Sequence, residues 1–215
     1  LSQGTISRTD AVRHIGGDAE EGGDGMHADR SDRRTRYTQM VLKKSLIEWM
    51  EQKPLAKITI KELCERADIN RCTFYAHYRD QYDLLQQIED EIISEIRERL
   101  SAFDFRADIG EAFQVVEQIF QYIADNRDFC SLLLSEKGDF SFQKRVTALF
   151  QEQYAQQWQA SRSTDPETVE YLYRYVITGS IGILQNWLKS GMRKSPGEMA
   201  GLLLRLTNQG LAAFS

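Results

Sequence analysis

The sequence predicts an all-α protein, with an N-terminal three-helix domain that contains a helix-turn-helix and a helical bundle after it. Three observations favour this fold class. From Arg33 onward, apolar residues recur almost throughout at helical spacing. The three prolines, at positions 54, 166 and 196, stand where a loop would run or a helix would begin. No hairpin signal and no sustained apolar/polar alternation indicates a β-strand.

Composition and charge divide the chain into three parts. Residues 1–32 are rich in glycine and poor in large apolar groups, which predicts a disordered tail. Residues 33–82 form the expected first domain and residues 83–215 the second. The first domain carries 11 Lys/Arg against 6 Asp/Glu, although the whole chain has a net charge of −5. A local basic excess favours contact with phosphates, and chance clustering on a solvated surface explains it equally well.

The first domain has clear helix start signals. A helix is expected over residues 33–51 and a loop over 52–57. Thr59 followed by Glu62 forms a capping box, with Ile58 and Leu63 as its hydrophobic staple, so the second helix starts at Thr59 and ends near Arg66. A turn over 67–69 leads to a third helix, capped by Asn70 and ending near residue 78.

The remaining helices follow from similar signals. Asp80 caps a long helix with an apolar stripe that reaches Leu100. Prolines at the first helical position mark two later helix starts. The expected later helices span residues 109–125, 127–135, 139–161, 166–189 and 196–213.

Two short capped helices joined by a three-residue turn are what a DNA-reading helix-turn-helix requires. The residues suited to its buried side are Ile60, Leu63, Cys64, Ala67, Ile69, Phe74 and Tyr78. The outer face of the second short helix then presents Arg71, Thr73, Tyr75, Ala76 and His77, whose groups suit contacts with bases and phosphates. We expect Tyr78 to be structural and Tyr75 to make contact. Arg33, Arg34 and Arg36 form either an arm that reaches DNA or the solvated start of a helix.

The stretch from Ile58 to Asp80, with its Thr-Phe-Tyr-Ala-His-Tyr run at 73–78, resembles the N-terminal domain of the TetR/AcrR family of regulators. The resemblance covers residues 34–85. It implies a homodimer that reads a palindromic operator in double-stranded DNA, and a C-terminal helical domain that dimerises and binds a small effector. The DNA-contacting residues that it implies are Thr59, Arg71, Cys72, Thr73, Tyr75, His77 and Arg79.

The resemblance also implies roles for the second domain. Its last two helices would pair with those of a second subunit, through Val176, Ile183, Leu184, Trp187, Leu202 and Leu206. Gly179 and Gly182, unfavourable inside a helix, suggest a close helix crossing there. Residues 178–191 resemble a subgroup of the family frequent in low-GC Gram-positive bacteria. The aromatic residues expected to line an effector pocket are Phe113, Phe120, Phe150, Tyr154, Tyr171 and Tyr175.

Other classes of function lack support in the sequence. The three cysteines are widely spaced and form neither a disulfide framework nor a zinc motif. The histidines lie in the tail and in the helix-turn-helix, so we expect no metal site, no cofactor and no enzyme activity. No apolar run is long enough to cross a bilayer and no secretory signal is recognisable, which predicts a cytoplasmic protein.

The residues leave two functional hypotheses open. The first is a repressor that a small-molecule effector releases from DNA. The alternative is a DNA-binding co-regulator whose C-terminal domain binds a partner protein instead of a metabolite.

Overall fold

The computed structural model describes residues 24–101, 109–135, 140–158 and 165–211. By their internal contacts, residues 1–38 and residues 39–215 form two compact units. The first helix, α1 (Asp24–Met50), begins in one unit and ends in the other. It starts nine residues before the predicted position, so residues 24–32 of the predicted tail are helical here. Residues 1–23 lie outside the described residues.

The helix-turn-helix follows α1 as predicted. A short 3-10 helix, η1 (Leu55–Lys57), occupies the expected loop. It leads to α2 (Ile60–Ala67) and α3 (Arg71–His77). The turn between them is closed by Asp68, whose backbone is left-handed at φ 53° and whose N–H donates to the Cys64 carbonyl. Aspartate tolerates this conformation better than most residues with a side chain, so the reversal needs no glycine.

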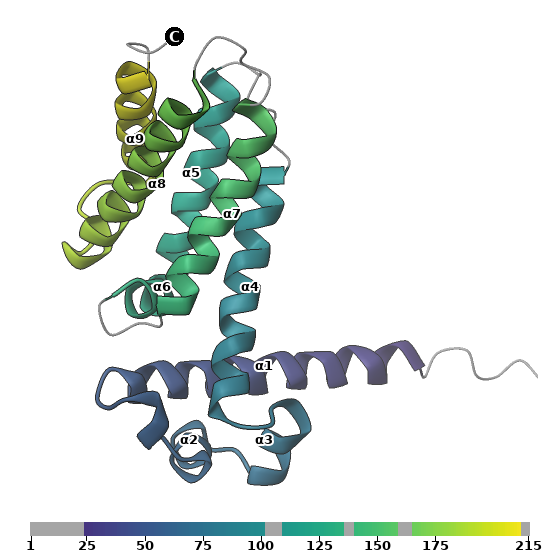
Figure 1. The fold of residues 1–215 in the computed structure, drawn as a ribbon. Coiled ribbons are helices and arrows are strands. Elements are labelled where there is room, and N and C mark those ends of the chain that lie inside the picture. Colours follow the sequence, from purple (N-terminus) through teal and green to yellow (C-terminus); the bar gives the residue numbers. More distant parts are fainter. Residues whose placement is uncertain (1–23, 102–108, 136–139, 159–164, 212–215) are drawn as a thin grey trace, which may run out of the picture. The chain divides into compact units, whose positions relative to one another are not determined.

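The second part is a bundle of six helices in the described residues: α4 (Gln81–Ser101), α5 (Ile109–Asp125), α6 (Arg127–Leu133), α7 (Phe140–Trp158), α8 (Pro166–Lys189) and α9 (Pro196–Leu211). Within it, α5 packs extensively against α9, and α4 packs against α5 and α7. Figure 1 shows α2 and α3 at the lower end of α4, and α5 and α7 along its upper length. The described residues contain no strand, which confirms the all-α fold class.

Side-chain caps set several helix starts, including the cap that the sequence predicts at Asn70. The Asn70 side chain accepts from the Cys72 N–H at 2.9 Å. Before α8, the Asp165 carboxylate accepts from the Thr168 N–H at 3.0 Å. Before α9, Ser195 and Glu198 cap each other reciprocally. Because each cap satisfies backbone N–H groups that the helix itself leaves without partners, these residues fix where each helix begins.

One buried apolar cluster reaches from α1 through the helix-turn-helix into the bundle. In the helix-turn-helix its most buried side chains are Leu63, Phe74 and Tyr78, each no more than 2% exposed. Tyr78 is therefore structural, as expected. Its hydroxyl oxygen is buried and has no hydrogen-bond partner among the described residues. Burial, the largest cause, raises the pKa of Tyr78 to about 12.

We predict that Tyr78→Phe leaves the protein as stable as the wild type or more so. A buried hydroxyl without a partner costs about 1–3 kcal/mol of desolvation, and phenylalanine keeps the ring without that group. Tyr78→Ala, the control, should lower the free energy of unfolding by about 3–5 kcal/mol because it leaves a cavity. Chemical denaturation followed by circular dichroism measures both, and a clear loss of stability in the phenylalanine variant would contradict a hydroxyl without a partner.

Candidate nucleic-acid interface and apolar cavity

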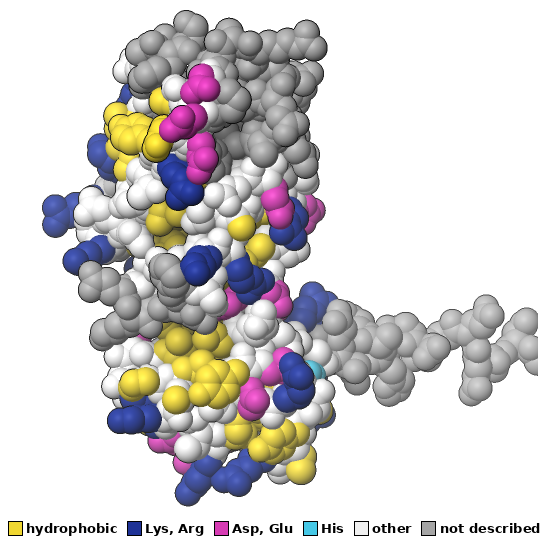
Figure 2. Space-filling model, viewed as in Figure 1, with side chains coloured by type: hydrophobic (Ala, Val, Ile, Leu, Met, Phe, Trp, Pro, Cys, Tyr) yellow, Lys and Arg dark blue, Asp and Glu magenta, His cyan; other side chains and the backbone are white. Residues whose placement is uncertain are grey.

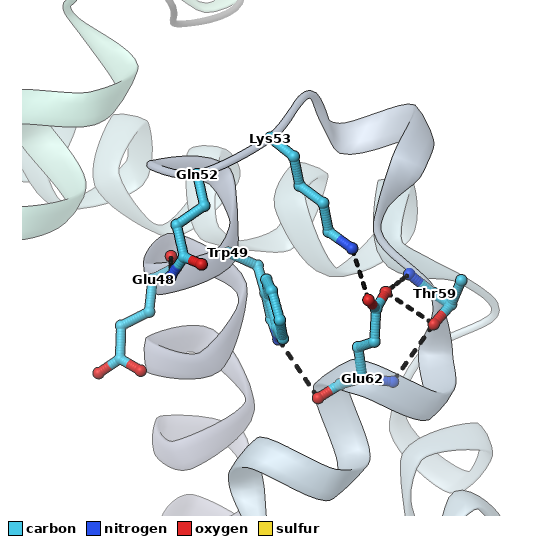
Figure 3. A network of polar contacts seen from close by, with 6 residues as sticks. All are labelled: Glu48, Trp49, Gln52, Lys53, Thr59 and Glu62. Atoms are coloured by element: carbon cyan, nitrogen blue, oxygen red, sulfur yellow. Dashed lines mark hydrogen bonds and ion pairs between the residues drawn. The ribbon is translucent and has the colours of Figure 1, made fainter.

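The position of α2 is fixed by its contacts with the end of α1. The buried Ser45 hydroxyl donates to the Leu63 carbonyl at 3.0 Å. The Trp49 indole N–H donates to the Glu62 carbonyl at 3.3 Å. Two cations lie over the Trp49 ring, Arg66 at 4.1 Å and Lys53 at 4.5 Å from its centre. These contacts hold α2 against the end of α1, and Figure 3 shows the one between Trp49 and Glu62.

The predicted capping box at the start of α2 is present and includes a third residue. The Thr59 hydroxyl accepts from the Glu62 N–H at 3.3 Å and donates to the Glu62 carboxylate at 2.8 Å. The same carboxylate accepts from the Thr59 N–H at 2.9 Å and from Lys53 Nζ at 2.6 Å. The Lys53 hydrogen bond, with those from Thr59, lowers the pKa of Glu62 to about 2. The carboxylate is thus ionised at neutral pH, and Figure 3 shows its contacts with Lys53 and Thr59.

The two faces of α3 have opposite characters. Phe74 is completely buried, and Tyr75, beside it, is 59% exposed. The Tyr75 ring meets the Phe74 ring edge-on, with 5.6 Å between their centres. Arg71, Cys72 and Ala76 are exposed as well, and Thr73 and His77 are half-buried. Because the inner face is anchored in the core, the outer face is presented to solvent in a fixed orientation.

Positive charge accompanies this outer face. Among the described residues, no carboxylate lies within ion-pair distance of Arg71. Arg79 pairs with Asp83 at 3.3 Å, yet its side chain stays 87% exposed. Lys57 and Lys61 on the preceding segment are exposed too. In Figure 2, Lys and Arg side chains cluster at the lower edge of the molecule, where Figure 1 places α2 and α3.

All seven residues predicted to contact DNA keep side chains that are at least partly accessible. Thr59, Arg71, Cys72, Tyr75 and Arg79 are exposed, whereas Thr73 and His77 are half-buried. Six of them lie on α3 or just after it, and Thr59 caps α2. The arrangement suits an anionic partner because it combines cations, hydroxyls and one exposed aromatic ring on two packed helices.

A second feature is an apolar cavity of about 250 Å³ inside the bundle. Residues from all six helices α4–α9 line it. On α4 these are Ile92, Ile96 and Leu100, which belong to the apolar stripe that the sequence shows. Phe120 and Phe150, two of the residues expected in an effector pocket, also line the cavity. The aliphatic side chains that form most of this wall were not predicted from the sequence, since the expected lining was aromatic.

Three of the aromatic residues expected in the pocket lie elsewhere. Phe113 faces α9, where its ring lies 3.7 Å from the points that a Cβ atom would occupy at Gly197 and at Gly201. Tyr171 and Tyr175 are 65% and 72% exposed, because they lie on the face of α8 opposite to the residues that line the cavity. The prediction that these three line the pocket is wrong. The side chain of Tyr154 lies outside the described residues.

Some of the residues expected at a dimer interface are buried within the subunit, and others are accessible. Val176 and Trp187 are buried within the subunit, so these two are corrected to the interior, and the half-buried Leu184 lines the cavity. Trp187 packs edge-on against Phe120 at 5.3 Å between ring centres, and its indole N–H donates to the Lys194 carbonyl at 2.9 Å. The remaining three are half-buried or exposed: Ile183, Leu202 and Leu206.

The exposed face of α8 has an unusual composition. Besides Tyr171 and Tyr175 it carries Gly179 and Gly182, which are exposed as well. A Cβ atom at either glycine would meet nothing within 4 Å among the described residues. The close helix crossing that these glycines suggested is therefore not one within the described part of the subunit. On α9, Leu206 is 52% exposed. Figure 2 shows hydrophobic side chains on the surface in the region of these helices.

The described residues offer neither a metal site nor a membrane span. No three His, Cys, Asp or Glu side chains gather there in a way that would hold a metal ion. No described helix combines the length and the hydropathy needed to cross a bilayer.

Known proteins with similar sequences and folds are transcriptional regulators. Residues 110–209 match the family model described as a transcriptional regulator C-terminal region. YxbF of Bacillus subtilis strain 168, described as an uncharacterized HTH-type transcriptional regulator, is 23% identical over 106 residues. That match covers 46% of this chain and 27% of YxbF, so the chain spans about a quarter of its relative's length.

Solved structures share the fold along most of the chain. A TetR transcriptional regulator from Streptococcus agalactiae 2603V superposes with a TM-score of 0.57 at 20% identity, over 84% of this chain and 98% of that one. The regulator FadR of Bacillus subtilis, solved in complex with stearoyl-CoA, has a TM-score of 0.57 at 13% identity, over 78% and 96% of the two chains. Identities this low establish similarity of fold alone.

Acidification should weaken the attachment of α2 through Glu62. Its pKa is lowered in the folded state, so the stability that it contributes is complete above about pH 4.5 and is lost as the pH falls toward about 2. Glu62→Gln keeps the capping geometry and lacks the charge. We predict that the wild type melts at a higher temperature than Glu62→Gln at pH 6, and that this difference narrows between pH 4.5 and pH 2. Thermal melts across that range test it, and a constant difference would contradict the assignment.

Proposed function

We propose that this chain is a transcriptional regulator of the TetR family, that it binds a palindromic operator as a homodimer and that a small molecule releases it. The observation that carries the proposal is the geometry of α3. Phe74 is anchored in the core, which leaves Arg71 and Tyr75 exposed on the opposite face. A short helix of this kind, in a helix-turn-helix, reads base edges in the major groove with its N-terminal residues.

The chemistry of the outer face supports distinct roles along α3. Arg71, at its first turn and without an ion-pair partner in the described residues, suits a base edge or a phosphate. Thr73 and the Tyr75 hydroxyl suit hydrogen bonds to base or backbone. Arg79 suits a flanking phosphate, as does His77. Cys72 stands between two of these contacts and offers only a small, weakly polar surface.

The exposed face of α8 and α9 supports the homodimer. A stripe of Tyr171, Tyr175, Gly179 and Gly182 on α8, with Leu206 on α9, combines large apolar groups with open space for close helix approach. A soluble monomer rarely exposes such a surface, and a second copy of the same face would cover it. This face replaces the buried Val176 and Trp187 and the cavity-lining Leu184 as the proposed contact.

The cavity supports a small-molecule effector rather than a partner protein, because it lies among six helices and its lining residues are mostly apolar and buried or half-buried. Ligand binding in the cavity would affect DNA binding through α4. Ile92, Ile96 and Leu100 on this helix line the cavity, and its N-terminal end directly follows α3. On α7, Arg145 bonds to Glu89 and Asp90 of α4. A ligand that displaces α4 would change the separation of two recognition helices from the roughly 34 Å of one DNA turn.

We predict that Arg71→Ala and Tyr75→Ala each weaken operator binding about tenfold or more while the dimer stays intact. Loss of a base contact costs about 1–3 kcal/mol, and loss of a phosphate contact lowers the slope of log K against log salt by about one. Fragments retained by the purified protein from genomic DNA supply the operator, and fluorescence anisotropy at several salt concentrations measures affinity.

Matched variants make this test specific. Arg174→Ala removes an exposed arginine from α8 and should leave DNA affinity unchanged. Tyr75→Phe keeps the ring and separates the role of the hydroxyl from that of the ring. Unchanged affinity in both Arg71→Ala and Tyr75→Ala would remove α3 from the interface.

For the dimer, we predict that Tyr175→Arg and Leu206→Arg shift the protein from dimer to monomer. Each places a charge on a face that would be desolvated on association. Light scattering coupled to size-exclusion chromatography reports the mass. Met40→Arg, which alters an equally exposed apolar residue on α1, is the control and should remain dimeric. Dimers in both α8 and α9 variants would place the interface elsewhere.

A further inference from the structure

The cavity also specifies the kind of molecule that it takes. We propose that its ligand is an uncharged, predominantly hydrocarbon molecule of roughly ten non-hydrogen atoms that carries a hydroxyl group. This inference rests on the proposed function, because it defines the effector of that regulator. Three properties of the cavity wall lead to it: the absence of charge, the placement of its few polar groups, and its volume.

The described wall of the cavity carries no charged side chain. Its polar side chains are Ser180 on α8 and Thr207 and Asn208 on α9, and the other lining residues are apolar apart from the Cys130 thiol. A buried ion without a counter-ion loses its hydration and recovers little, at a cost of several kcal/mol. A cationic or anionic group would therefore find no partner along this wall. The neutral environment disfavours both signs of charge.

The pKa of Cys130 reflects the apolar environment of the cavity wall. Its thiol lies at the cavity and is only 2% exposed. Burial raises the pKa of Cys130 to about 12, so the thiol is neutral at physiological pH. The same desolvation that suppresses a thiolate would act on a ligand carboxylate or phosphate.

The polar groups indicate where a ligand hydroxyl would bind. The Ser180 hydroxyl donates to the Val176 carbonyl at 2.6 Å, so toward the cavity it is left with accepting capacity. Its complement is a ligand donor, which an alcohol or a phenol supplies without charge. Asn208 is exposed and Thr207 half-buried, so the α9 side is where the cavity meets solvent.

The volume sets the size of the ligand. A dry apolar protein cavity of about 150 Å³ holds one benzene molecule. In proportion, the 250 Å³ cavity holds a body of roughly ten non-hydrogen atoms. A larger ligand would extend toward solvent on the α9 side or need the surrounding helices to move.

Isothermal titration calorimetry of the full chain with octan-1-ol, octanoate and octylammonium tests which ligand charge the cavity prefers, because all three ligands have the same alkyl chain. We expect octan-1-ol to bind at least about 100-fold more tightly than either ion, as a desolvation cost of several kcal/mol requires. Affinity for either ion within tenfold of that for octan-1-ol would overturn the proposal. Failure of all three to bind a protein that still binds its operator would overturn it too.

Variants of the wall locate the binding. Ser180→Ala should weaken octan-1-ol binding about 2- to 10-fold without affecting operator affinity. Val116→Phe on α5 and Leu203→Phe on α9 fill the cavity from two sides, and each should abolish octan-1-ol binding. If only one of the two variants folds, that variant alone is enough for the test. Octan-1-ol binding that neither filled variant reduces would place the ligand outside the cavity and overturn the proposal.

Operator release is measured separately. Octan-1-ol that binds as expected but leaves the DNA complex intact would refute the release mechanism and leave the ligand class standing. If the wild-type protein binds no DNA but still binds octan-1-ol, the proposed function is refuted and the ligand class stands.

Discussion

The candidate DNA-reading surface depends on the burial of Phe74 and Tyr78. The helix that carries Phe74 has seven residues and ends directly before Tyr78, and it is far shorter than an isolated helix needs to be for stability in water. Its conformation therefore comes from packing the inner face, with Asn70 fixing its first turn. Because the helical repeat links the two faces, burying Phe74 at the same time determines which way Arg71 and Tyr75 point. The candidate DNA-reading surface is thus a consequence of how the core packs.

A continuous helix joins this surface to the cavity. The first turn of α4 is tied to the segment after α3, where the Asp83 carboxylate accepts from the Arg79 N–H at 2.8 Å. Further along, the same helix contributes aliphatic side chains to the cavity wall. Arg145 on α7 connects to α4 between these two regions through Glu89 and Asp90. A rigid element with one end at each site is the kind of structure that can transmit an effect between them.

The helices were predicted more successfully than the sites because helix starts are local. Thr59, Asn70 and Asp165 cap the residues immediately after them, and their spacing is visible in the chain. Which face of α8 turns inward is not local, since the helix has apolar residues on both. Val176 and Trp187 looked like interface residues and lie in the core, whereas Tyr171 and Tyr175 looked like pocket residues and lie outside. Only the packing of α8 on α6, α7 and α9 decides this.

The distribution of the three cysteines has a practical consequence. Cys64 and Cys130 are buried, and burial raises the pKa of each thiol, so neither is readily alkylated in the folded state. Cys72 is exposed on α3. A maleimide dye added to the unmodified protein would thus attach selectively to α3. Cys72 is therefore a natural position for a spectroscopic label at the surface where DNA is proposed to bind.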